Sequence, residues 1–104
     1  MIYELRTYTL RPGTMAEFLL RVERDGLPIA RKYLKLVGYW QSETGTLNQM
    51  FHMWAHDSLD ARAANRAKLM ADPDWHETYL KYVLPLFERQ ETVILKPTPF
   101  SPLQ

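Results

Sequence analysis

The sequence predicts an α+β fold in which one four-stranded antiparallel sheet carries helices on a single face. Segments rich in Tyr, Thr, Val, Ile and Trp alternate with segments whose apolar residues recur at helical spacing, and their order along the chain is βαββαβ. Elements in this order form a ferredoxin-like sheet. The length of 104 residues fits a single domain that covers residues 1–104.

The first half of the chain supplies one strand and one helix. Residues 2–10 are predicted to form the strand because they lack Gly and Pro and are rich in β-formers. After a turn at residues 11–13, the helix is predicted to begin at Thr14. Thr14 and Glu17 have the capping-box spacing, in which each side chain reaches a free backbone N–H. The Asp-Gly pair at residues 25–26 is predicted to end the helix.

A hairpin is predicted in the middle of the chain. Residues 34–43 and 48–56 have strand character and flank a short Thr-Gly-Thr connection. Regular alternation along the first of these strands places Leu36 on the same face as Trp40 and opposite to Tyr39.

The second half is predicted to hold two helices and the last strand. Ser58 caps a helix that runs to about Ala71. The predicted buried stripe of this helix is Leu59, Ala63, Ala67 and Met70. Asp72 caps a further helix, which Pro85 ends or kinks. The last strand is predicted over residues 89–96, and the Pro-rich tail at residues 97–104 is expected to be extended.

Composition narrows the classes of protein that fit. The net charge of +1 without a basic run gives no indication of nucleic acid or membrane binding, and the chain has no cysteine. Neither a signal peptide nor an apolar run of membrane-spanning length is present, so a cytoplasmic protein is expected. The aromatic share of 12% predicts rings along an interface or a cavity. The second face of the sheet needs a cover, and a homodimer provides one.

The candidate ligand-binding residues are Arg6, Tyr8, His52 and Trp54. Each pair shares one face of its strand, because side chains two apart on a strand point the same way. The two strands are expected to be neighbours, but their register, and hence a common cavity, is open. His52 is the candidate catalytic residue as an acid or base, or it is a hydrogen-bonded core histidine. Glu4 must pair with Arg6 if their face is enclosed, unless Arg6 binds an anion.

Helix and loop residues offer weaker candidates. Arg62 and Arg66 lie four apart on one side of a helix and either bind an anion or are neutralised locally. Trp75 packs a helix junction or walls a ligand. His52 and His56 would lie about 13 Å apart on a strand, so no metal site is expected. No phosphate-binding loop or nucleophile elbow is present, and no cofactor is expected.

Several stretches of the chain together resemble the NIPSNAP family. They are IYELRTYTLRPGTMAEF at the start, LNQMFHMW in the third strand, and SLDARAANRAKLMADPDW in the following helix. The resemblance implies a dimeric α+β barrel, an architecture also used by antibiotic-biosynthesis monooxygenase-like and haem-degrading proteins. It supplies no catalytic residues.

Three functions remain open at this stage. The favoured one is a homodimeric barrel that binds a small, partly apolar molecule between sheet and helices. The alternatives are a cofactor-independent monooxygenase-like enzyme and a protein–protein interaction module without a pocket.

Overall fold

The computed structural model describes residues 1–104 and places four strands and a helical layer in the predicted order. The strands are β1 (Ile2–Leu10), β2 (Lys35–Gln41), β3 (Gln49–His56) and β4 (Phe87–Leu95). The first helical stretch consists of α1 (Met15–Arg21), a π-helical segment (Val22–Gly26) and α2 (Leu27–Ala30). The second half holds α3 (Leu59–Ala71), a π-helical segment (Trp75–Leu80), α4 (Lys81–Val83) and a 3-10 turn (Leu84–Leu86).

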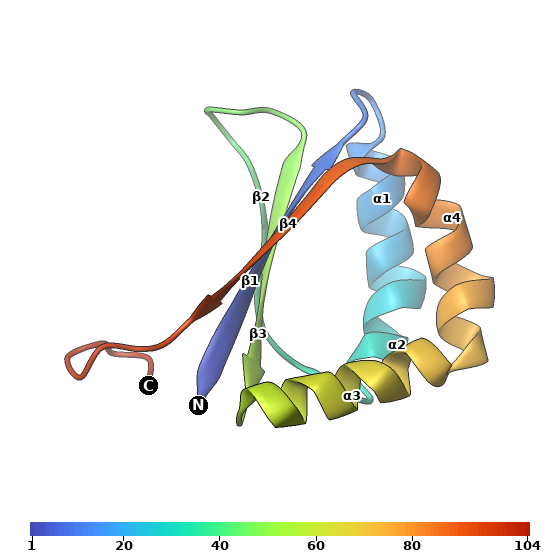
Figure 1. Cartoon of the computed structure of the whole chain (residues 1–104). Coiled ribbons are helices and arrows are strands. Elements are labelled where there is room, and N and C mark those ends of the chain that lie inside the picture. The colour runs from blue at the N-terminus through green and yellow to red at the C-terminus, as the bar shows by residue number, and fades with distance from the viewer.

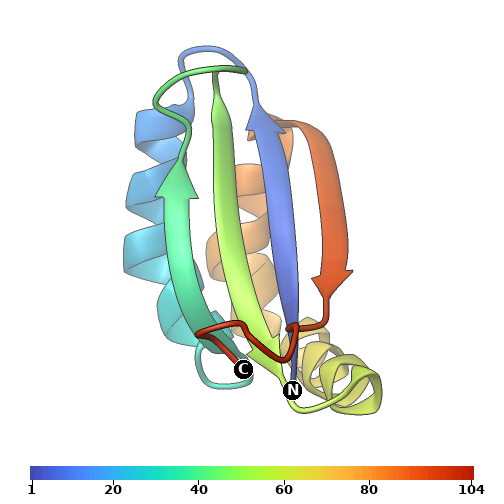
Figure 2. The same ribbon diagram turned by 90° about the vertical axis from the view of Figure 1, so that its left-hand side faces the viewer.

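The strands form one antiparallel sheet in the order β2-β3-β1-β4. All helices lie on one face of that sheet (Figure 1), and the other face is open along the strands except where the C-terminal tail crosses it (Figure 2). Helix α3 runs from the end of β3 across to the helical layer (Figure 1). This arrangement confirms the predicted α+β, ferredoxin-like class.

The first helix differs from its prediction at both ends. The Thr14 side chain caps no backbone N–H; its hydroxyl instead donates to the carbonyl oxygen of Arg11 at 2.7 Å, so the predicted capping box is wrong. The helix also continues through Asp25 and Gly26 to Ala30. Gly26 keeps helical backbone angles there because it packs against Tyr79, whose ring would lie 2.6 Å from a Cβ atom at this position. Close packing of two helices therefore outweighs the local end signal.

The prediction for the faces of β2 is also wrong for one residue. The pairing with β3 shifts between Leu36 and Gly38, so Val37 is an extra residue in the ladder. As a result Leu36 pairs with Trp54 and packs on the helix side, the side that Tyr39 also faces.

The buried side of α3 is not the predicted stripe. Leu59 and Met70 are 60% and 40% exposed, and both alanines of the stripe are exposed as well. The side turned toward the sheet instead carries the buried Leu69 together with the half-buried Arg62 and Arg66. Arg62 faces inward because the buried Glu4 carboxylate on β1 accepts hydrogen bonds from it.

The core lies between the sheet and the helices. One cluster surrounds Leu10, Phe18 and Val83, which are completely buried, and a second surrounds Trp54 and Leu69. Residues 97–104 contain a turn in which the Ser101 N–H donates to the Thr98 carbonyl oxygen. No helix of the chain combines the length and the apolar character needed to cross a membrane.

Candidate functional site

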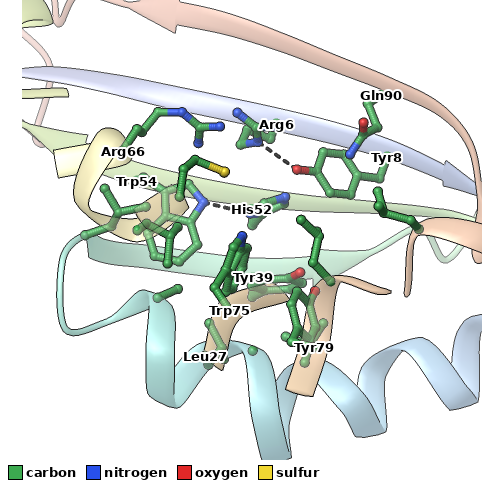
Figure 3. Close-up of a pocket in the computed structure, with 18 of the residues that line it drawn as sticks. Arg6, Tyr8, Leu27, Tyr39, His52, Trp54, Arg66, Trp75, Tyr79 and Gln90 are labelled. Carbon is green, nitrogen blue, oxygen red and sulfur yellow. Dashed lines mark hydrogen bonds between the residues drawn. The ribbon is translucent and has the colours of Figure 1, made fainter. Parts of the chain in front are cut away.

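A cavity of about 230 Å³ lies between the two core clusters, with the sheet as its floor and the helices as its walls (Figure 3). Most of its lining is apolar or aromatic. The polar or ionisable side chains that line it are Arg6, Tyr8, Tyr39, His52, Trp54, Arg66, Trp75, Tyr79 and Gln90. The lining contains no Asp or Glu side chain.

The register of the central strands brings the four predicted site residues together. Arg6 lies directly opposite His52 in the β1–β3 ladder. The Tyr8 and His52 rings are 4.8 Å apart at their centroids, edge to face. The Trp54 Nε1–H donates to His52 Nδ1 at 2.7 Å. The question of register that the sequence left open is therefore answered, and all four residues line one cavity.

His52 is a neutral imidazole within this site. It is only 6% exposed, and its ring stacks on Tyr39 at a centroid distance of 4.8 Å. Burial, together with the charge of Arg6, lowers the pKa of His52 to about 3. Because Nδ1 accepts from Trp54, the ring proton resides on Nε2. That buried nitrogen has no hydrogen-bond partner in the chain.

Glu4, next to the cavity, is a buried carboxylate that binds two arginines, one from β1 and one from α3. Its carboxylate is 1% exposed and accepts hydrogen bonds from Arg6 at 2.8 Å, Thr92 at 2.7 Å and Arg62 at 2.8 and 2.9 Å. His56 Nε2 lies 3.2 Å from it. Burial alone would raise the pKa of Glu4, but the bonds from Arg62 and Thr92 and the charge of Arg6 outweigh it and hold the pKa well below the usual range. The expected Glu4–Arg6 ion pair is present.

The two arginines of α3 have different environments. Arg62 is neutralised by Glu4, whereas Arg66 makes no hydrogen bond or ion pair with the chain. Arg66 is half-buried at the cavity wall, and burial followed by the charge of Arg6 lowers its pKa. Its guanidinium lies beside that of Arg6 (Figure 3).

Four further polar or ionisable side chains line the cavity, and the strand patterns did not indicate them. Tyr39 and Gln90 come from the two edge strands, and Trp75 and Tyr79 from the π-helical segment after α3. Burial raises the pKa values of the Tyr39 and Tyr79 phenols above their usual range, so both stay neutral. Trp75 stacks at a tilt on Tyr79, and its buried Nε1–H has no partner. Of these four residues the sequence singled out Trp75 as a possible ligand wall, and for the two tyrosines the aromatic excess was the only signal.

Comparisons of the sequence with known proteins all indicate the same family. The family model for NIPSNAP matches residues 3–102. The human protein NipSnap homolog 3A is 35% identical over 105 residues, covering 100% of this chain and 42% of the relative. Human NipSnap homolog 2 is 36% identical over 109 residues, covering 99% of this chain and 35% of the relative. The chain thus spans less than half the length of these curated relatives.

Solved structures agree in fold along the whole chain. A NIPSNAP family protein with unknown function from Agrobacterium tumefaciens superposes with a TM-score of 0.96 at 47% identity, covering 100% of this chain and 94% of that chain. An antibiotic biosynthesis monooxygenase from Bordetella bronchiseptica, described as putative, superposes with a TM-score of 0.70 at 16% identity, covering 93% and 96%, and shares the fold alone. From these matches, and from the residues that first suggested it, the chain belongs to the NIPSNAP family.

Proposed function

We propose that this domain binds a small, partly apolar molecule in the cavity between its sheet and its helices. The observation that carries the proposal is the cavity itself, about 230 Å³ with largely apolar and aromatic walls. A cavity of about 150 Å³ holds a benzene molecule, so this one has room for a ring with a short side chain.

Unpartnered polar groups support the same conclusion. His52 Nε2 and Trp75 Nε1 are buried N–H donors without an acceptor in the chain. An unsatisfied buried donor costs about 1–3 kcal/mol, and a ligand or an ordered water that accepts from it removes that cost. The cavity between the sheet and the helices also favours ligand binding over the protein–protein interaction module, because in such a module side chains would fill this space.

The protonation states favour binding over acid–base catalysis. With a pKa of about 3, His52 is neutral at pH 7 and is a weak base there. Tyr39 and Tyr79 hold their protons more tightly than a free phenol does. His52 therefore serves in this proposal as a fixed hydrogen-bond donor.

Tryptophan fluorescence tests the proposal directly. Of the three tryptophans, Trp54 and Trp75 line the cavity, whereas Trp40 is 52% exposed on the other face. In a Trp40→Phe protein all tryptophan emission comes from the two rings that line the cavity. We expect a screen of single-ring compounds to yield members that quench this emission saturably and raise the melting temperature.

Two leucine substitutions serve as filled and control variants. Ala30→Leu should weaken the binding of these compounds because Ala30 lines the cavity, and Ala16→Leu should not because Ala16 is exposed on α1. Equal binding by the parent and by Ala30→Leu, or no binding compound in the screen, would contradict the proposal.

We further propose that two copies pair through the open face of the sheet. Trp40, Val93 and Leu95 on that face are 52%, 48% and 38% exposed, beside the half-buried Phe51 and Met53. Monomeric proteins rarely expose so continuous an apolar patch, and a second copy covers it symmetrically. Sedimentation should give twice the chain mass of 12.3 kDa, and Val93→Glu should shift the protein toward monomer. A monomeric parent at micromolar concentration would rule out the pairing.

A further inference from the structure

We propose that the cavity selects a monocarboxylate with an apolar body, and that Arg66 binds its carboxylate group. This inference rests on the proposed function, because it names the class of ligand that the same cavity takes.

The charged groups around the cavity do not balance. The guanidinium groups of Arg6 and Arg62 repel that of Arg66, and the Glu4 carboxylate attracts it. The Glu4 oxygens already accept from two arginines and from Thr92. The site therefore holds an excess of positive charge within a partly buried region.

Arg66 is the group through which an anion would restore the balance. It is half-buried, has no acceptor in the chain, and experiences the repulsion of Arg6. A guanidinium of this kind is costly to keep without a counter-charge. A carboxylate placed against it gains two parallel charge-assisted hydrogen bonds, for which the planar guanidinium is well shaped.

The other groups that line the cavity determine which ligand body can accompany the carboxylate. His52 Nε2 is a buried donor with no partner, and the lining has no acidic side chain that would repel an anion. Apart from Arg6 and Gln90, the rest of the lining is mainly aliphatic and aromatic. One charged end and an apolar body are therefore expected, and a neutral compound of the same shape should bind less tightly.

Pairs of compounds that differ only in charge test the selection. The probes are benzoate, phenylacetate, 3-phenylpropanoate and cyclohexanecarboxylate, each with its neutral amide, titrated into the Trp40→Phe protein at pH 7.5. We expect at least one carboxylate to bind about tenfold to a hundredfold more tightly than its amide, as charge-assisted hydrogen bonds imply.

Variants of α3 then assign the effect to one residue. Arg66→Gln should remove the advantage of the carboxylate and leave the affinity for the amide unchanged, and Arg66→Lys should retain part of it. Lys68→Gln, which removes an exposed charge two residues away on the same helix, should change neither affinity.

The possible failures are distinct. Amides that bind as tightly as their acids, or carboxylate binding that survives Arg66→Gln, would overturn the inference while the proposed binding function stands. Tighter binding of phenyl phosphate than of every carboxylate would overturn the choice of the carboxylate class. If no compound of either charge binds and the wider screen is also empty, the proposed function itself falls.

Discussion

Arg62 and Glu4 form a two-point ion pair that joins helix α3 to the central strand β1. Arg62 Nε donates to Oε1 at 2.9 Å, and Nη2 donates to Oε2 at 2.8 Å. Arg66, one turn further along the same helix, makes no such bond. The two arginines thus have the same position relative to the helix axis but different roles, one in stability and the other at the cavity.

Substitution should separate these two roles. Arg62→Gln should lower the free energy of unfolding by about 1–3 kcal/mol, because it leaves the buried Glu4 with fewer donors. Arg66→Gln should change it by less than about 0.5 kcal/mol or raise it, because an unpaired half-buried charge is removed. Urea denaturation measures both. An Arg66→Gln protein as destabilised as Arg62→Gln would show that Arg66 also has a structural partner.

The low pKa of His52 should make the fold sensitive to mild acid. In the unfolded chain the pKa is near 6.5 and in the folded protein about 3, so between these values the unfolded state binds more protons. His52 therefore contributes stability above pH 6.5 that is lost as the pH falls toward 3.

Between pH 8 and pH 5 the loss through His52 should be about 2 kcal/mol. His52→Gln removes this titration, so the difference in unfolding free energy between parent and variant should shrink by that amount at pH 5. His76→Gln, at an exposed histidine, is the matched control. A constant difference across this range would show that the pKa of His52 is not lowered in the folded protein.

The contact between Gly26 and Tyr79 should not tolerate a methyl group. A Cβ atom at residue 26 would lie 2.6–2.9 Å from three atoms of the Tyr79 ring, and that ring is buried in a cavity wall. Gly26→Ala should cost about 1–3 kcal/mol through overpacking, although alanine is the better helix former.

A double-mutant cycle identifies the cause. In a Tyr79→Leu background the smaller side chain leaves room for the methyl group, so Gly26→Ala should be close to neutral or favourable there. An equal cost in both backgrounds would place the conflict elsewhere.

The residues at the N-terminal ends of α3 and α1, Ser58 and Thr14, should contribute differently to stability. The Ser58 side chain accepts from the Ala61 N–H at 3.0 Å, so Ser58→Ala should cost about 0.5–2 kcal/mol. Thr14 donates to the Arg11 carbonyl oxygen and caps nothing, so Thr14→Ala should cost less than Ser58→Ala. The denaturation midpoints of the two variants test this prediction. A larger loss of stability in Thr14→Ala than in Ser58→Ala would show that Thr14 provides the stronger cap.

The sequence patterns predicted the bounds of several strands and helices well. The strand at Ile2–Leu10 and the helix at Leu59–Ala71 have the bounds expected from composition and the Ser58 cap. Patterning failed where one local event changed the outcome. The extra residue Val37 moved Leu36 to the other face, and the one local sign of this bulge is the neighbouring Gly38, which strand alternation alone does not take into account.

The site was predictable along strands and much less so from helices. Arg6, Tyr8, His52 and Trp54 emerged because alternation fixes which side chains share a face, although only the structure supplied the register. The inward side of α3 was misjudged because apolarity was taken as its guide. The buried Glu4 attracts an arginine there, and this long-range pairing leaves no periodic signal.

The position of β1 between β3 and β4 has a consequence for how the chain folds as it is synthesised. β1 is made first and β4 last, so one edge of the central strand stays unpaired until residues 87–95 have emerged. Until then Glu4 lacks the Thr92 hydroxyl, and the cavity lacks the wall that includes Phe87 and Gln90. Pairing across so long a loop is slow, and an open strand edge invites pairing with other chains. The nascent domain is therefore exposed to pairing with other chains until its final strand docks.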